Sequence, residues 1–198
     1  MHLELICGPM FSGKSSVLQA RIRRFDTLGW KTLVLTSALD TRDDKVDGSF
    51  SSVMTHDGVG MPALAVRELA PIRQWKDYEG ARAILIEEAQ FFPDLLQFVL
   101  HAVEVDGKDI VVVGLDGDRD RNRFGQVLDL IPYADVVTKL TALCCRCGDG
   151  SPALFSALLR HTPSSSERDG QIRVGGAGVY EPMCRRHFLQ YRRDLPPY

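Results

Sequence analysis

The sequence lacks any long apolar run and any strong excess of charge. None of its 198 residues belongs to a stretch apolar enough to span a bilayer, and no secretory signal is recognisable among the first residues. Lys and Arg number 24 against 26 Asp and Glu, a net charge of −2, which argues against a generic nucleic-acid binder. We therefore expect a cytoplasmic protein with no membrane partner and no nucleic-acid partner.

Cysteine is also scarce, and its count is odd. The odd number and the clustering argue against a disulfide framework and favour a reducing compartment with a metal site. Cys7 lies inside an apolar run and is expected to be buried packing. The five cysteines are Cys7, Cys144, Cys145, Cys147 and Cys184.

A glycine-rich loop is the strongest motif present. Residues 8–15 read G-P-M-F-S-G-K-S, which fits the phosphate-loop (P-loop) pattern G-x-x-x-x-G-K-[ST] between an apolar run and a helix-like stretch. Its backbone N–H groups can form a nest for phosphate oxygens, Lys14 can reach the β/γ-phosphates, and Ser15 can bind Mg²⁺. The alternative is a glycine turn that caps an ordinary helix. The expected phosphate-binding residues are Gly8, Pro9, Met10, Phe11, Ser12, Gly13, Lys14 and Ser15.

Two carboxylates end a second apolar run. Residues 83–86 predict a buried strand, and Glu87 and Glu88 follow it directly. An acid at this point in a P-loop enzyme orients Mg²⁺, and a neighbour can take the nucleophile's proton. Successive residues of a strand face opposite ways, so two roles are favoured over one shared role. The alternative is a charged strand end.

The remaining pattern predicts an α/β fold of the P-loop NTPase type, with a mostly parallel sheet flanked by helices. Arg42 follows a predicted strand over 31–36 and could meet a phosphate or form a loop salt bridge. Residues 43–60 lack apolar periodicity and predict a mobile surface segment. Further elements are expected as helices over 14–28, 68–78, 93–105 and 126–131 and strands over 63–66, 109–115, 136–137 and 140–143.

The last quarter contains two pairs of metal-ligand type. Cys144-x-x-Cys147 is followed by Cys184-x-x-His187, which suits a tetrahedral structural zinc. Residues 153–159 and 171–174 could form a hairpin between the two pairs. The alternative is four unrelated residues, with Cys145 as an extra thiol.

Taken together, these motifs make the chain similar to the thymidine kinase family of the zinc-containing, non-herpesviral type. The resemblance covers nearly the whole chain, with the motifs in family order. Its motifs are G-P-M-F-S-G-K-S (8–15), D-T-R (40–42), E-A-Q-F-F (88–92), L-D-G-D (115–118), F-G-Q-V-L-D-L-I-P (124–132), T-K-L-T-A (138–142), C-x-x-C (144–147), G-G-A-x-x-Y (175–180) and C-x-x-H (184–187).

The resemblance implies transfer of the ATP γ-phosphoryl group to the 5′-hydroxyl of thymidine, with Mg²⁺ and a structural Zn²⁺. Glu88 matches the family's proton acceptor, and Glu87 and Ser15 match its Mg²⁺ ligands. The ATP-binding set then extends to Arg42, Glu87, Glu88, Ala89 and Gln90. The residues matching the nucleoside site are Met10, Phe91, Arg119, Phe124, Ser156, Gln171, Ile172, Arg173, Val174, Gly175 and Tyr180.

The same resemblance implies a P-loop domain over 1–143 and a zinc-binding lasso domain with a C-terminal tail over 144–198. It also implies a homotetramer inhibited by dTTP. Three residues depart from the family pattern: Glu87 replaces Asp, Arg119 replaces Phe, and Arg123 replaces Pro. They leave open a kinase with altered base preference or a non-catalytic nucleotide-binding protein. A DNA-acting ATPase fits the negative net charge less well.

Overall fold

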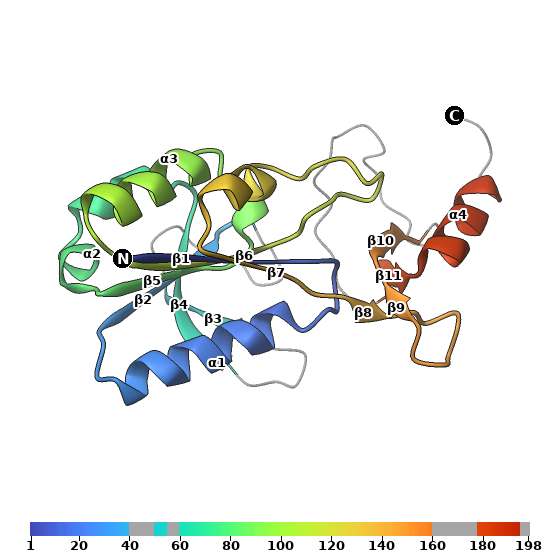
Figure 1. The fold of residues 1–198 in the computed structure, drawn as a ribbon, viewed down its shortest axis with the longest axis horizontal. Coiled ribbons are helices and arrows are strands. Elements are labelled where there is room, and N and C mark those ends of the chain that lie inside the picture. The colour runs from blue at the N-terminus through green and yellow to red at the C-terminus, as the bar shows by residue number, and fades with distance from the viewer. Residues whose placement is uncertain (40–49, 55–59, 160–177, 195–198) are drawn as a thin grey trace.

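The computed structural model describes residues 1–39, 50–54, 60–159 and 178–194. Its centre is a sheet with the strand order β3-β4-β2-β5-β6-β1-β7 (Figure 1). Neighbouring strands are parallel except for β3, which is antiparallel to β4. This confirms the predicted fold class. The strands are β1 (His2–Cys7), β2 (Thr32–Ser37), β3 (Phe50–Met54), β4 (Gly60–Val66), β5 (Ala83–Ile86), β6 (Asp109–Gly114) and β7 (Val136–Lys139).

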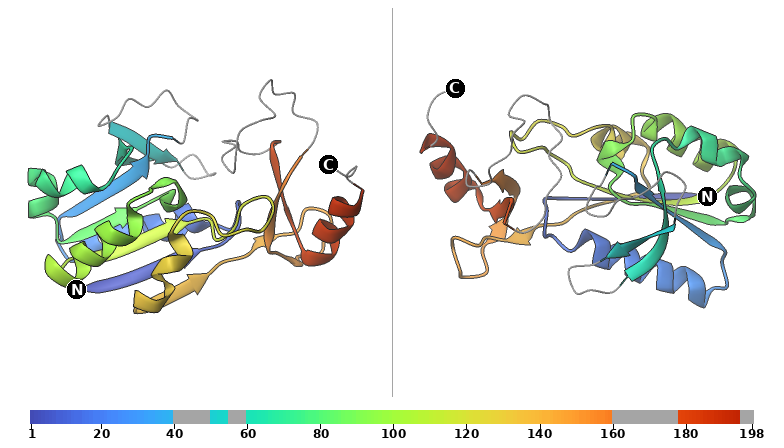
Figure 2. Two further views of the ribbon diagram at one scale, coloured as in Figure 1. Left: turned by 90° about the horizontal axis from the view of Figure 1, so that it is seen from above. Right: turned by 180° about the vertical axis from the view of Figure 1, so that it is seen from behind.

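Helices cover both faces of the sheet, which is why its central strands are apolar throughout. Helix α1 (Lys14–Thr27) lies on one face, and α2 (Lys76–Gly80) and α3 (Leu95–Leu100) lie on the other (Figures 1 and 2). All four residues of β5 are completely buried. Cys7 is buried in the same core, as expected from the sequence.

Three predicted helices are more irregular than their sequence pattern suggests. The helix predicted over 68–78 is a 3₁₀ turn over Ala70–Gln74 followed by α2, because Trp75 between them has an extended backbone (φ −87°, ψ 141°). The helix predicted over 93–105 begins at Leu95 and ends in a π-helical turn over His101–Val105. The short helix predicted over 126–131 is a 3₁₀ helix over Val127–Tyr133.

The prediction of a surface segment over 43–60 is wrong where Phe50–Met54 form β3. This edge strand pairs with β4, with Phe50 opposite Leu64 and Met54 opposite Gly60. An edge strand is held by backbone hydrogen bonds to one neighbour, so it needs no apolar alternation in its own sequence. Residues 40–49 and 55–59 of that segment lie outside the described ranges.

Beyond the carboxyl ends of β1 and β6 lies a small unit that we call the Cys/His module (Figures 1 and 2). Its β10 pairs with β11, whereas the sequence suggested residues 171–174, which the structure does not describe. Strand β11 ends directly before Cys184. The module consists of β8 (Ala142–Leu143), β9 (Pro152–Ala153), β10 (Phe155–Leu158), β11 (Tyr180–Met183) and α4 (Arg185–Arg193).

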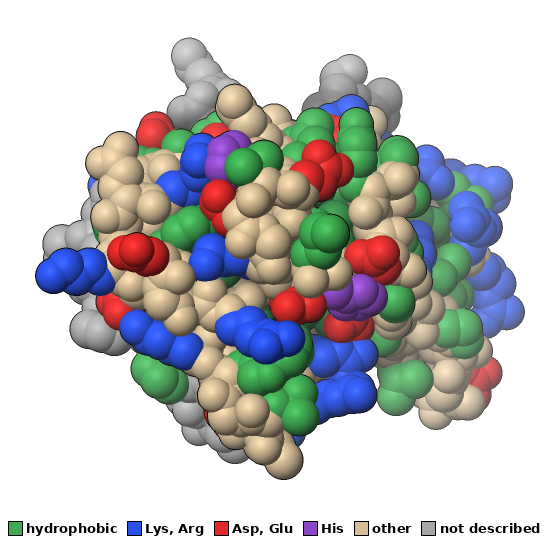
Figure 3. Space-filling view, turned by 60° about the vertical axis from the view of Figure 1, so that its left-hand side comes forward, with side chains coloured by type: hydrophobic (Ala, Val, Ile, Leu, Met, Phe, Trp, Pro, Cys, Tyr) green, Lys and Arg blue, Asp and Glu red, His purple; other side chains and the backbone are tan. Residues whose placement is uncertain are grey.

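The described helices and surface add two observations. Within the described ranges, every helix is too short or too polar to cross a membrane. On the face shown in Figure 3, Lys and Arg side chains are interspersed with Asp and Glu side chains. The described part of that face therefore presents both signs of charge.

Candidate functional site

The P-loop has the predicted context, since β1 ends at Cys7 and α1 begins at Lys14. Two of its glycines are required by geometry. Gly13 has a left-handed backbone (φ 81°), and a Cβ on Gly8 would lie 2.5 Å from the carbonyl oxygen of Leu140. The sequence therefore folds into the tight turn that exposes successive N–H groups to a phosphate.

Lys14 is placed among carboxylates at the start of α1. Its ammonium group donates a hydrogen bond to the Pro9 carbonyl oxygen at 2.7 Å. Desolvation lowers the pKa of Lys14, and the charges of Glu88, Asp116 and Glu87 act in the opposite direction. A phosphate group would supply the negative charge that this partly desolvated cation needs.

A buried hydroxyl in the same loop points to a polar ligand. The Oγ atom of Ser12 is inaccessible to solvent and has no hydrogen-bond partner among the described residues. Buried hydroxyl groups are nearly always hydrogen-bonded, so an unpaired one requires an explanation. Phosphate oxygens at the P-loop would provide the missing partner.

Glu88 is held in a defined orientation. It has a left-handed backbone (φ 51°), which is uncommon for a residue with a side chain. The buried amide of Gln90 donates from Nε2 to Glu88 Oε2 at 2.6 Å and accepts from the Leu115 N–H at 3.0 Å. The sequence assigned Gln90 to the phosphate site, and the structure places it beside Glu88, where it fixes the carboxylate. Glu87 precedes Glu88 and is almost completely buried.

Asp116 was missing from the residues proposed on the sequence. It follows β6 and pairs with Lys139, whose Nζ lies 2.7 Å from Oδ2. Burial raises the pKa of the Cys7 thiol, and the Asp116 carboxylate raises it further. The sequence could have pointed to Asp116 in the same way as to Glu87, because each is an acid that follows the apolar run of a predicted buried strand. Because β5, β6 and β1 are neighbours in the sheet, Glu87, Glu88 and Asp116 lie at the same edge as the P-loop, and all three carboxylates act electrostatically on Lys14.

Two of the aromatic residues proposed for the nucleoside site are in contact. The rings of Phe91 and Phe124 meet edge to face, with centroids 5.5 Å apart and an interplanar angle of 87°. Phe124 ends the loop that follows β6, and this loop is closed by a bridge between Gly117 and Arg123. Arg119 lies in the same loop, with its Nε 3.5 Å from Asp120 Oδ2.

Gly125 fixes this loop against the segment that carries Glu88. Its φ is +56°, and a Cβ would lie 2.2 Å from the Gln90 carbonyl oxygen.

We expect Gly125→Ala to lower the free energy of unfolding by about 2–4 kcal/mol, because the loop must move and the left-handed backbone is strained. Activity should fall as well. The matched control is Gly29→Ala, which has a similar φ of +68° but open space around it. In urea unfolding, Gly29→Ala should lower the free energy of unfolding by about 1 kcal/mol. An equal decrease for Gly29→Ala and Gly125→Ala would contradict the steric argument.

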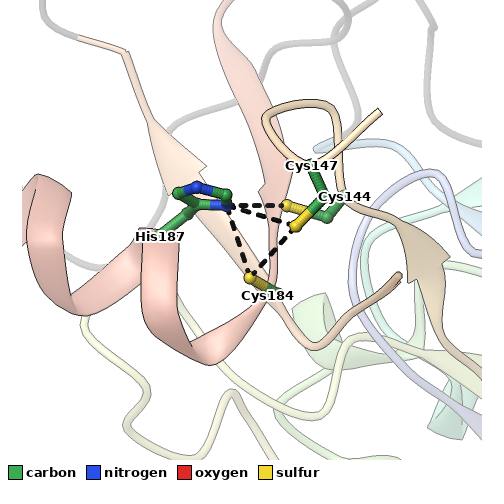
Figure 4. A group of neighbouring side chains, drawn as sticks. All are labelled: Cys144, Cys147, Cys184 and His187. Carbon is green, nitrogen blue, oxygen red and sulfur yellow. Dashed lines mark hydrogen bonds between the residues drawn. The ribbon is translucent and has the colours of Figure 1, made fainter. Parts of the chain in front are cut away.

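The two ligand pairs, Cys144 with Cys147 and Cys184 with His187, converge in the Cys/His module (Figure 4). Nδ1 of His187 lies 3.5 Å from Sγ of Cys144, 3.4 Å from Sγ of Cys147 and 3.5 Å from Sγ of Cys184. The Sγ atoms of Cys147 and Cys184 are 3.7 Å apart. A tetrahedral Zn²⁺ with ordinary bond lengths requires separations of about 3.6 Å between sulfur and nitrogen and about 3.8 Å between sulfurs. The four side chains therefore fit a structural zinc ion.

The pKa values of two thiols in the cluster are shifted in opposite directions, that of Cys147 upward and that of Cys144 downward. Burial opposes ionisation of the Cys144 thiol, but hydrogen bonds from the Cys184 backbone, the His187 side chain and other groups lower its pKa to about 6. The thiolate is the form that binds metal. Cys145 is exposed and is not part of the cluster, as the sequence interpretation allowed.

The module reaches the P-loop directly. Ser156 on β10 was proposed to line the nucleoside site, and its Oγ accepts a hydrogen bond from the Met10 N–H at 2.9 Å. Tyr180 begins β11, opposite Leu158. The structure thus brings together the P-loop, the acids, the aromatic pair and the module. Arg42, Gln171, Ile172, Arg173, Val174 and Gly175 lie outside the described residues.

Comparisons with known proteins agree with this arrangement. A family model described as "Thymidine kinase" matches residues 1–188. The chain is 43% identical over 190 residues to "Thymidine kinase a" of Arabidopsis thaliana, covering 94% of this chain and 74% of that protein. It is 38% identical over 195 residues to "Thymidine kinase, cytosolic" of Homo sapiens, covering 98% of this chain and 76% of that protein. It is 34% identical over 188 residues to the "Thymidine kinase" of Variola virus, covering 95% of this chain and 97% of that protein.

Proposed function

Because the chain belongs to the thymidine kinase family, we propose that it transfers the γ-phosphoryl group of ATP to the 5′-hydroxyl of thymidine, giving dTMP and ADP. The observation that carries this proposal is the juxtaposition of the P-loop with the carboxylates that follow β5 and β6. A loop that binds phosphate and an oriented carboxylate are the two parts that phosphoryl transfer to a hydroxyl requires.

Glu88 accepts the proton in the proposed reaction. The 5′ oxygen of the nucleoside forms a bond to the γ-phosphorus, the bond from that phosphorus to the β,γ-bridging oxygen breaks, and the hydroxyl proton passes to the Glu88 carboxylate. Gln90 supports this role because its amide holds Glu88 Oε2 at 2.6 Å. The carboxylate is then oriented before substrate binds, which reduces the reorganisation needed in the transition state.

The P-loop binds and orients the triphosphate. Its N–H groups and Lys14 hold the phosphate oxygens, and the Ser12 hydroxyl, unpaired among the described residues, is available to them. Ser15 and Glu87 would hold Mg²⁺, which when bound neutralises the charge that develops between the phosphates. Arg42, Ala89 and Gln90 complete the ATP-side set proposed on the sequence.

The nucleoside is proposed to lie against the pair formed by Phe91 and Phe124. An edge-to-face aromatic pair offers one flat ring for stacking on a base. Arg119 stands in the same loop, and its guanidinium could stack on the base in place of an aromatic ring. This substitution is the specific reason to test bases other than thymine.

Four further features belong to the proposal. We propose a structural zinc in the Cys/His module, a zinc domain beginning at Cys144 after β8, inhibition by dTTP and a location in the cytosol. The location is supported by the word "cytosolic" in the name of the human relative. We also propose a homotetramer, and exposed Val136 and Val137 on the edge strand β7 offer apolar surface for a second copy.

A radiolabelled γ-phosphate transfer assay tests the function. Zinc-loaded protein with Mg²⁺-ATP is given thymidine, deoxyuridine, deoxycytidine or deoxyguanosine, and kcat/KM is compared. We expect thymidine to be the best substrate by at least about tenfold, the discrimination expected of a shaped base pocket. A different best substrate would assign a changed base preference to the Arg119 loop. Nucleotide binding without labelling of any nucleoside would leave only a nucleotide-binding role.

A further inference from the structure

One side chain joins the P-loop to the Cys/His cluster. Phe11 lies in the middle of the P-loop and packs against the apolar core of the module. Three of the four proposed zinc ligands share this core. It consists of buried Ala142, Cys144 and Ala153, with Phe11, Cys147 and Cys184 packed against it.

The backbone of Phe11 has an unusual conformation. Its φ is +64°, in the left-handed region that bulky residues rarely adopt. Such a conformation persists only where the surroundings hold it, and the module core is in contact with Phe11. The same φ sets the direction of the loop amides that follow, which are the groups expected to hold phosphate.

The preceding residue is fixed by the module as well. The N–H of Met10 donates to Ser156 Oγ at 2.9 Å, and Ser156 on β10 is only 6% exposed. Two successive residues of the P-loop are therefore held by the module, one through a hydrogen bond and one through apolar packing.

We propose that Phe11 and Ser156 are positioning residues that couple the zinc cluster to the P-loop, so that zinc binding and nucleotide binding strengthen each other. The module core is too small to keep its shape without the cluster that Cys144 and Cys147 help to form. Loss of zinc would release the packing of Phe11 and loosen the loop. The inference rests on the proposed function only in taking ATP as the ligand of the P-loop.

Thermodynamic reciprocity gives the test. If zinc raises the affinity of the P-loop for nucleotide by some factor, nucleotide must raise the affinity for zinc by the same factor. The zinc-loaded full chain is challenged with a chromogenic chelator, with and without Mg²⁺ and saturating β,γ-imido-ATP. We expect the analogue to reduce zinc release to the chelator at equilibrium, which corresponds to about tenfold tighter zinc binding, and zinc-depleted protein to bind the analogue about tenfold more weakly.

Matched variants assign the coupling to particular residues. In Phe11→Ala and in Ser156→Ala, the analogue should change zinc release by a factor close to one. In Phe11→Leu, the analogue should keep most of its effect on zinc release. Phe25→Ala is the control, because that ring stacks on Trp30 with centroids 5.1 Å apart, away from the module. It should leave the tenfold effect intact.

The outcomes separate this inference from the proposed function. An analogue that binds the wild type without reducing zinc release at equilibrium would overturn the coupling and leave the kinase proposal standing. Unchanged coupling in both Phe11→Ala and Ser156→Ala, or its loss in Phe25→Ala, would also overturn it. Coupling in a protein that phosphorylates no nucleoside would defeat only the kinase proposal. If the wild type does not bind the analogue at all, both fail.

Discussion

Glu88→Gln should reduce kcat for nucleoside phosphorylation by about 10³-fold, the range expected for loss of a general base. Glutamine has nearly the same shape, and its carbonyl oxygen can still accept the hydrogen bond from Gln90 that Glu88 accepts at 2.6 Å. What the variant loses is the ability to take the 5′-hydroxyl proton. Single-turnover assays with labelled ATP measure the chemical step directly.

Binding measurements show whether the Glu88→Gln loss is chemical. The Kd of the variant for β,γ-imido-ATP should stay within about threefold of wild type, since a transition-state interaction is lost and ground-state binding is kept. Glu104→Gln is the control, because Glu104 is an exposed acid far along the chain from the P-loop. A Glu88→Gln rate within tenfold of wild type would exclude Glu88 as the base and direct attention to Glu87 or Asp116.

Cys147→Ser should abolish zinc binding and reduce nucleoside phosphorylation by at least about 100-fold. A structural zinc contributes about 10–16 kcal/mol of binding energy in small zinc-dependent folds. The described residues of the module offer little else to hold it together: they form two sheets of two strands each and two apolar clusters with three buried members each. Zinc content by atomic absorption and amide exchange over 142–193 should show the loss.

The matched control for Cys147→Ser lies two residues away. Cys145 is exposed and outside the ligand cluster, so Cys145→Ser should keep one zinc per chain and full activity. Amides of β5 and β6 should stay protected in both variants, because their core is formed by the main sheet and its helices. One bound zinc and full activity in Cys147→Ser would refute the zinc assignment.

The sequence alone determined those parts of the protein that depend on neighbouring residues. The P-loop could be recognised because its glycines, Lys14 and the flanking strand and helix lie within one short stretch. Glu87 and Glu88 could be placed because they directly follow an apolar run. The zinc ligands could be paired because each half of the site has the local spacing C-x-x-C or C-x-x-H, and the structure confirms that the halves meet.

Only the tertiary structure decided how those parts contact one another. Gln90 is anchored by the Leu115 N–H, and Asp116 joins the acids, because β5 and β6 lie side by side, which no local pattern specifies. Ser156 and Phe11 tie the module to the P-loop across about 130–150 positions of chain. Strand β3 escaped prediction because its pairing with β4 uses backbone hydrogen bonds, which any sequence can supply. Local spacing records short-range geometry, whereas contacts between distant segments depend on how the whole chain packs.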